Sequence, residues 1–251
     1  MTFSANLGFL WQELPLPDAI RAAKAAGFAA VECHWPYDVP ARDVAAALRE
    51  TGLPMLGLNT RRGAPGENGL SALPGRGSDA RAAVDEALAY ADAVDAAAVH
   101  VMAGFAEGDE AEAAFVHTLR HACAATDRSI LIEPLNHYDA PGYFLKTTAQ
   151  AEAIIAKVAA PNLKLMFDCY HVQLMEGDVT HRLKRLLPLI GHIQFASVPD
   201  RGAPDHGELS YAHAFGVIDG MGWAAPLGAE YKPQGPTAPT LGWMKQSFTD
   251  G

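Results

Sequence analysis

The chain has 251 residues and a formal net charge of −10, and hydrophobic residues make up 49% of it. This length and apolar content fit one globular domain and are close to those of a single α/β barrel. No segment approaches the ~20 uninterrupted apolar residues of a membrane-spanning helix, and no Lys/Arg-rich segment offers a surface for nucleic acid. We therefore expect one domain over residues 1–251, with neither a membrane nor a nucleic-acid partner.

The N-terminus and the cysteines indicate the compartment. The first residues, MTFSANLGFLWQELP, have no basic leader and only a short apolar run, so they do not resemble a secretory signal. Cys33, Cys123 and Cys169 form no CxxC pair, which indicates neither a disulfide framework nor a zinc knuckle. We expect a cytoplasmic protein with reduced cysteines.

Short apolar runs alternate along the chain with longer Ala- and Leu-rich segments of helical period, which is typical of parallel strands joined by crossover helices. The predicted strands are Phe3–Leu7, Ala30–Cys33, Met55–Leu58, Ala98–Met102, Ile130–Glu133, Leu163–Asp168, His192–Phe195 and Leu227–Tyr231. The predicted helices are Leu16–Ala26, Val39–Thr51, Ser78–Val94, Asp109–Thr126, Thr148–Val158, Asp178–Leu187 and Tyr211–Asp219. This alternation predicts a single (β/α)8 TIM barrel.

Residues at the predicted helix ends support this assignment. Ser78 and Thr148 can each accept a hydrogen bond from first-turn amides, and Gly27 and Gly52 stand where a helix ends. The segment Asn59–Gly77 is rich in Gly and Pro and has neither helical nor strand period. Long connections of this kind are usually lids or binding loops, so we expect it beside the barrel mouth; a disordered insert is the alternative.

Four polar residues stand at or just past the ends of the last four predicted strands. They are Glu133 in ILIEPLN, Asp168 in LMFDCYH, Gln194 in HIQFA and Glu230 in GAEYKP. Successive members are separated by about one β/α unit, so their side chains can converge at the C-terminal face of the barrel, where active sites lie. Each one alone could instead pair with a neighbouring Arg or Lys.

Three carboxylates buried together would repel one another, and desolvation would add to the cost. A divalent cation resolves this conflict. Three carboxylates and one amide form an all-oxygen ligand set, which suits Mg²⁺ or Mn²⁺ better than zinc or copper. The sequence therefore predicts a metal site made by Glu133, Asp168, Gln194 and Glu230.

Several longer segments closely resemble the hydroxypyruvate isomerase family of xylose isomerase-like barrels. They are ENGLSALPGR, VHVMAG, ILIEPLN, APGYFL, FDCYHVQLMEGD and GAEYKP, and the resemblance runs from about Leu7 to Trp243. Related sugar epimerases share the metal constellation but usually have a histidine where this chain has Gln194.

The resemblance implies an isomerase that interconverts hydroxypyruvate and tartronate semialdehyde through an enediol, with Glu133 and Glu230 as proton donor and acceptor. A cation bound to the carbonyl and hydroxyl oxygens would stabilise the negative charge that appears as a carbon-bound proton leaves. The implied partner is a small keto or hydroxy acid. Whether the chain forms a homo-oligomer is left open.

Five further residues are candidates for substrate binding. His171 follows Asp168 by three residues, and His100 ends an apolar run; helix capping and a core position are their structural alternatives. Arg201 and Glu208 correspond to an Arg and a Glu beside the family's active site, and Lys232 follows Glu230 closely. An arginine there could hold a carboxylate in a two-pronged hydrogen bond.

The substrate is open at this stage. Family members commonly have a histidine straight after the arginine, whereas Gly202 follows Arg201 here. A 2-oxo-tetronate isomerase or a ketose 3-epimerase would use the same chemistry. A DNA-repair endonuclease of the superfamily would need a histidine-rich zinc site and a basic surface, and the sequence has neither. A non-catalytic sugar-acid-binding barrel would be expected to lack one of the four ligands.

Overall fold

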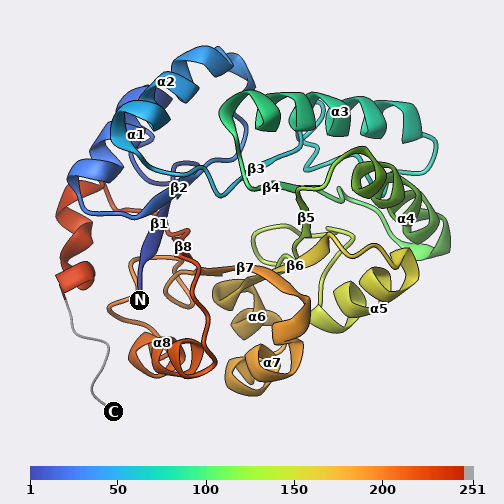
Figure 1. Ribbon diagram of the computed structural model, residues 1–251. Helices are drawn as coiled ribbons and strands as arrows, with labels where there is room; N and C mark the ends of the chain where they lie inside the picture. Colours follow the sequence, from blue (N-terminus) through green and yellow to red (C-terminus); the bar gives the residue numbers. More distant parts are fainter. Residues whose placement is uncertain (246–251) are drawn as a thin grey trace.

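Eight short parallel strands lie at the centre of the computed structural model, which describes residues 1–245, and helices surround them (Figure 1). The strands are β1 (Phe3–Asn6), β2 (Ala30–Glu32), β3 (Gly57–Asn59), β4 (Ala98–His100), β5 (Ser129–Ile132), β6 (Leu163–Asp168), β7 (Ile190–Phe195) and β8 (Leu227–Ala229). Hydrogen-bonded neighbours follow the order β2-β1-β8-β7-β6-β5-β4-β3. An isolated parallel bridge between Val31 and Met55 joins the two ends. The predicted barrel is confirmed.

Helices follow the strands and cover the outside of the barrel. They are α1 (Leu16–Ala25), α2 (Ala41–Thr51), α3 (Gly77–Val94), α4 (Gly108–Ala125), α5 (Thr148–Val158), α6 (Cys169–Met175), α7 (Val179–Leu186) and α8 (Tyr211–Gly220), with the 3₁₀ helices η1 (Pro36–Asp38), η2 (Leu187–Leu189) and η3 (Ala238–Lys245). Within residues 1–245, none of the helices is long and apolar enough to cross a membrane.

The main core lies between the strands and one face of each helix. In α2, for example, Val44, Ala45 and Leu48 are buried, a spacing that places them on one side of the helix. Full burial of a Val or Leu side chain contributes about 1.5–3 kcal/mol, so these faces hold the helices against the barrel.

Helix α6 was not predicted. It begins directly after β6, and the side chain of Asp168 forms its N-terminal cap by accepting a hydrogen bond from the amide of Tyr170 at 2.9 Å. With seven residues, it is too short for a helical period to be recognised in the sequence. Its position matters because it carries His171 back over the end of the strand.

The predicted helix caps are partly wrong. Helix α5 is capped by Thr147, whose hydroxyl accepts a hydrogen bond from the amide of Gln150 at 3.1 Å. Thr148 is buried in the first turn, where its hydroxyl donates to Glu176. Helix α3 begins at Gly77 without a side-chain cap, so Ser78 lies inside its first turn. The prediction of a helix end at Gly52 is confirmed by its left-handed φ of 67°.

The segment 59–77 packs against the exit of β4. Gly69 forms an antiparallel bridge with Ala103, and the amide of Ala72 donates to the carbonyl of Ala103 at 2.7 Å. Gly69 has a φ of +112°, and a Cβ at this position would lie 2.5 Å from the carbonyl oxygen of Met102. Only glycine permits this contact, which fixes the segment beside the mouth of the barrel.

A candidate active site at the barrel mouth

A cavity of about 390 Å³ opens over the C-terminal ends of the strands. Its wall contains charged, aromatic and amide side chains from loops that are distant in sequence. Among them are Phe9, His34, Trp35, Arg62, Asn68, His100, Glu133, Asp139, His171, Arg201, Glu230 and Lys232. This is the face on which active sites of such barrels form.

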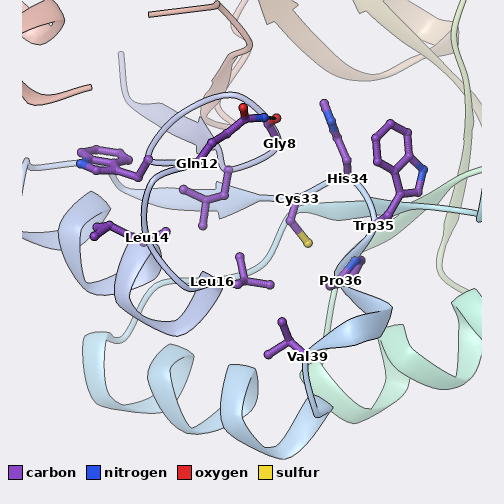
Figure 2. Close-up of a pocket in the computed structure, with 12 residues that line it drawn as sticks. Gly8, Gln12, Leu14, Leu16, Cys33, His34, Trp35, Pro36 and Val39 are labelled. Carbon is purple, nitrogen blue, oxygen red and sulfur yellow. Dashed lines mark hydrogen bonds between the residues drawn. The ribbon is translucent and has the colours of Figure 1, made fainter. Parts of the chain in front are cut away.

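A neighbouring cavity of about 410 Å³ lies between α1 and the loops after β1 and β2 (Figure 2). Leu16, Cys33 and Val39 face one another across it. It shares His34 and Trp35 with the first cavity but has no carboxylate in its wall. The carboxylates therefore belong to the first cavity.

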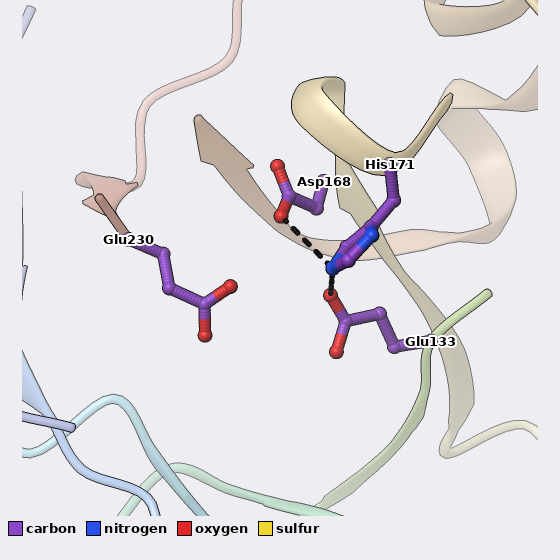
Figure 3. A group of neighbouring side chains, drawn as sticks. All are labelled: Glu133, Asp168, His171 and Glu230. Carbon is purple, nitrogen blue, oxygen red and sulfur yellow. Dashed lines mark ion pairs between the residues drawn. The ribbon is translucent and has the colours of Figure 1, made fainter. Parts of the chain in front are cut away.

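Three acids and a histidine lie close together at this first cavity, and Glu133, His171 and Glu230 line its wall (Figure 3). One ligand atom from each of Glu133, Asp168, His171 and Glu230 lies within 4.8 Å of the others, and all four residues are buried. Glu133 follows β5, Asp168 ends β6, His171 belongs to α6 and Glu230 follows β8. The convergence predicted for the three carboxylates is therefore present, and His171 joins them.

His171 is oriented by the loop after β5. Its Nδ1 accepts a hydrogen bond from the backbone amide of Asn136 at 3.1 Å, so this nitrogen carries no proton. Burial and the charge of Arg201 lower the pKa of His171 to about 3, which leaves the ring neutral with its proton on Nε2. That nitrogen lies 3.6 Å from Asp168 Oδ2 and 3.8 Å from Glu133 Oε1.

This tautomer defines what His171 can do. A metal-binding histidine usually donates from its second nitrogen to an acceptor, whereas Nδ1 of His171 is itself an acceptor. Its Nε2–H is therefore a hydrogen-bond donor directed at the carboxylates, and the lone pair needed by a cation is absent there. The atoms that can bind a cation here are therefore the carboxylate and amide oxygens.

Glu230 has the most hydrogen bonds of the three acids. Its Oε1 accepts from the Asn6 amide at 2.9 Å and lies 3.0 Å from His34 Nε2. Its Oε2 accepts from Arg201 at 2.6 Å. Burial opposes the charge of this carboxylate, but Arg201 and His34 hold the pKa of Glu230 well below its usual range.

Arg201 is held in place from several directions. Its guanidinium also donates to Asp139 at 3.1 Å and lies 3.8 Å from Asp168. The rings of Phe9 and Tyr170 lie 4.7 and 5.0 Å from its guanidinium carbon. The backbone of Arg201 has a left-handed φ of 56°, a strained conformation that the surrounding contacts maintain. This arginine already has carboxylate partners, which does not favour its predicted role in holding the substrate carboxylate.

Glu133 and Asp168 have fewer partners. Burial, together with the charges of Glu230 and Asp168, raises the pKa of Glu133 well above its usual value. Burial and the charge of Glu230 raise the pKa of Asp168 to about 8. His100 Nδ1 lies 3.8 Å from Glu133, and burial lowers the pKa of His100 to about 4, so the ring is neutral. Arg201 alone does not compensate three carboxylates.

A divalent cation fits this donor set. Glu133 Oε1, Asp168 Oδ2 and Gln194 Oε1 are buried oxygens without a hydrogen-bond partner. A buried polar atom left unpaired costs about 1–3 kcal/mol, so such oxygens call for a ligand. Carboxylate and amide oxygens are the ligands that Mg²⁺ and Mn²⁺ prefer. Glu133, Asp168, Gln194 and Glu230 could hold such an ion.

The remaining predicted site residues do not all line the first cavity. His100 and Lys232 line the cavity. Gln194 lies in the wall of a smaller internal cavity of about 10 Å³ beneath the site. Glu208 is exposed and does not line the first cavity, and its backbone amide donates to the carbonyl of Val198. The structure does not bring Glu208 to the site.

Four further residues that contact or line the site are not among the predicted ones: His34, Asn136, Asp139 and Arg62. His34 could have been found, because it closely follows a strand end as Glu133 does. Asn136 and Asp139 lie in an irregular loop, where no periodic pattern indicates the direction of a side chain.

Comparison with known proteins identifies the family. The family model described as "Xylose isomerase-like TIM barrel" matches residues 20–247. A 2-oxo-tetronate isomerase from Cupriavidus necator is 44% identical over 252 residues, which cover 97% of this chain and 97% of that protein. A hydroxypyruvate isomerase from Escherichia coli is 36% identical over 254 residues, covering 97% of this chain and 98% of that protein.

A solved structure from Brucella melitensis, titled AP endonuclease, family 2, has a TM-score of 0.93 and 38% sequence identity, with 97% of this chain and 98% of that chain covered. The chain belongs to the xylose isomerase-like TIM barrel family, and within it to the isomerases. Relatives named hydroxypyruvate isomerase and 2-oxo-tetronate isomerase match it over nearly its full length, which confirms the resemblance described above.

Proposed function

We propose that the protein interconverts a short 2-oxo acid bearing a neighbouring hydroxyl group and its isomeric hydroxy-carbonyl acid. Hydroxypyruvate and tartronate semialdehyde are the leading pair. The observation that supports this most strongly is the convergence of three buried carboxylates within 4.8 Å, among them oxygens that have no hydrogen-bond partner. The names of the relatives support the substrate class.

A bound Mg²⁺ or Mn²⁺, held by Glu133, Asp168, Gln194 and Glu230, would supply Lewis-acid stabilisation of the negative charge that develops on the substrate oxygens. One glutamate carboxylate removes the proton from the hydroxyl-bearing carbon, and the other returns a proton to the former carbonyl carbon. The hydroxyl proton passes to the former carbonyl oxygen, so that the new carbonyl and the new hydroxyl group both form. The substrate passes through an enediol. His171 Nε2–H donates a hydrogen bond to an oxygen of the reacting group, and Arg201 keeps Glu230 charged and aligned.

The substrate carboxylate belongs at the rim of the cavity. Arg62 and Lys232 line it, and neither has an ion-pair partner among residues 1–245. The Arg62 guanidinium lies 4.7 Å from the ring centre of Trp35, and the Lys232 ammonium lies 5.9 Å from that of Phe9. An anionic head group there is attracted by two cations and stays away from the three acids.

A four-carbon substrate, 2-oxo-tetronate, is the second candidate. The isomerase of that name from Cupriavidus necator shares 44% of its residues with this chain. The extra CH₂OH group requires only added room, and a cavity of about 390 Å³ leaves that room beside the reacting carbons. A nucleic-acid substrate is disfavoured by the net charge of −10, which repels phosphates.

The proposed proton transfer is tested by measuring the incorporation of solvent deuterium into the product. The protein is supplied with Mg²⁺ or Mn²⁺ in D₂O and incubated with hydroxypyruvate or with 2-oxo-tetronate, and the product is examined by NMR. Deuterium on the newly protonated carbon is expected for proton transfer through an enediol. Turnover of neither acid, with Mn²⁺ bound, would overturn the proposal.

The two glutamates are tested by amide substitution. Because a general acid or base contributes about 10²–10⁴-fold to the rate, Glu133→Gln and Glu230→Gln are each expected to lower kcat by at least ~10²-fold. Bound metal is measured on the same samples, because either change removes a charged ligand. The exposed Glu112→Gln is a matched control that leaves the rate unchanged. A variant that binds metal and retains full kcat would exclude that glutamate from proton transfer.

A further inference from the structure

A buried ion pair crosses the inside of the barrel beneath the proposed site. Glu32 at the end of β2 and His192 in β7 approach to 2.6 Å, and their side chains are only 5% and 7% exposed. Neither residue lines the first cavity, in which the substrate is proposed to bind. Burying two ionisable groups is costly, and replacing such a pair with apolar residues is often neutral or stabilising. Their presence calls for an explanation other than stability.

The pair spans two intervening strands. In the sheet, β1 and β8 separate β2 from β7, and Ser4 of β1 is the register partner of Gly228 in β8. A Cβ at Gly228 would lie 2.3 Å from Glu32 Oε1 and 2.9 Å from His192 Nε2. Its φ is not in the left-handed region, so glycine is required here for space rather than for backbone conformation. The absence of a side chain at Gly228 thus leaves the space in which Glu32 reaches His192 of β7.

The same close packing involves Gln194. A Cβ at Gly228 would lie 2.7 Å from Gln194 Cγ, and Gln194 is the register partner of both Gly228 and Asp168. Gln194 Nε2 donates to Glu32 Oε2 at 3.4 Å, and that carboxylate oxygen also bonds His192. The Glu32 oxygen thus accepts its hydrogen bond from the NH₂ end of the Gln194 amide. The amide oxygen then has no donor, as observed for Oε1.

We propose that the Glu32–His192 pair is a positioning device for Gln194: it holds the amide nitrogen and thereby presents Oε1 as an oxygen ligand beside Asp168. This inference rests on the proposed metal site. Without the carboxylate, the amide could turn over and place its NH₂ group, which cannot bind a cation, on the side of the site. His192 fixes Glu32, and Gly228 leaves the space that this arrangement occupies.

The experiment measures Mn²⁺ binding to metal-free protein by calorimetric titration, with no substrate present. Glu32→Gln keeps the shape of the side chain but lets the neighbouring amide adopt either orientation. Loss of an outer partner of a metal ligand typically costs 10–100-fold in affinity, so we expect Mn²⁺ to bind about 10–100-fold more weakly. Melting of the metal-free variant is recorded in parallel.

A double-mutant cycle separates orientation from charge. If Glu32 acts through Gln194, the effect of Glu32→Gln disappears in a Gln194→Ala background, because the ligand it orients is gone. An equal loss of affinity in both backgrounds would mean that Glu32 acts by its charge alone, and the inference would be wrong. If Glu32→Gln does not fold, His192→Gln replaces it in the same cycle with the same expected outcomes.

A matched control is available elsewhere in the chain. Glu176 is paired with Arg182 at 2.8 Å and its side chain is 9% exposed, but it lines neither cavity. Glu176→Gln is expected to lower the melting temperature and leave Mn²⁺ affinity unchanged. If Asp168→Asn abolishes Mn²⁺ binding while Glu32→Gln leaves it intact, the positioning role fails and the metal site stands. If Asp168→Asn also has no effect, the proposed metal site itself fails.

Discussion

Glu133 and Glu230 are chemically unequal although both follow strands of the same barrel. Glu230 accepts from Arg201 and Asn6, and its surroundings favour the charged form. Glu133 has one oxygen without a partner, and its surroundings oppose the charge. The difference comes from hydrogen bonds, because Arg201, Asn6 and His34 contact Glu230 directly.

The rim cations give a prediction for single residues. If Arg62 and Lys232 hold the substrate carboxylate, Arg62→Ala and Lys232→Ala each raise KM by at least ~10-fold, since a hydrogen bond to a charged group contributes about 1.5–3 kcal/mol. The kcat is expected to change less, because neither side chain reaches the reacting carbons. Steady-state kinetics provide both values.

Arg42→Ala serves as the control, because this arginine lines neither cavity at the mouth and is exposed. Unchanged KM in both rim variants would place the substrate carboxylate elsewhere in the cavity.

Part of the site could be predicted from residue positions. The even spacing of Glu133, Asp168 and Glu230 along the chain is enough to bring them together, because successive strand ends meet at one face. The contacts that decide their protonation could not be predicted. His34, Asn136 and Asp139 reach the site through loop geometry, which no local pattern in the sequence encodes.

At the level of elements, the alternation of apolar runs and helical segments predicted the barrel and the bounds of α5 and β6. The errors occur at ends and in short pieces. The cap of α5 was placed one residue late because Thr147 and Thr148 are both suitable cap residues, and only the turn decides which hydroxyl faces the free amides. Helix α6 is not predicted because it is short and follows β6 without a linker.

This shift in the cap is testable. Thr147→Ala removes the hydroxyl that accepts from the Gln150 amide, and the loss is expected to lower the free energy of unfolding by about 1 kcal/mol. Thr147→Ser retains the acceptor and is expected to stay close to the parent protein. Urea unfolding measures both; equal stability of the alanine and serine variants would contradict the cap assignment.

For the whole molecule, a cation bound by the folded state alone stabilises the fold. At Mn²⁺ about 100 times its dissociation constant, the gain is about 2.7 kcal/mol, or roughly 5–10 °C in melting temperature for a domain of this size. Chelation should reverse it. Calorimetric melting with and without Mn²⁺ measures the shift, and Asp168→Asn is expected to eliminate it. A shift that persists in that variant would point to binding elsewhere.

The ring of strands is least continuous between β2 and β3. There, a single isolated bridge and a few backbone hydrogen bonds, among them Leu56 to Val31 at 2.7 Å, replace the longer ladder that joins β6 to β7. Thermal opening of the ring should begin at this seam, so the amides of Val31 and Leu56 are expected to exchange with solvent deuterium before those between β6 and β7. Because His34 closely follows β2 and contacts Glu230, each opening would also release one of the contacts that keep this glutamate charged.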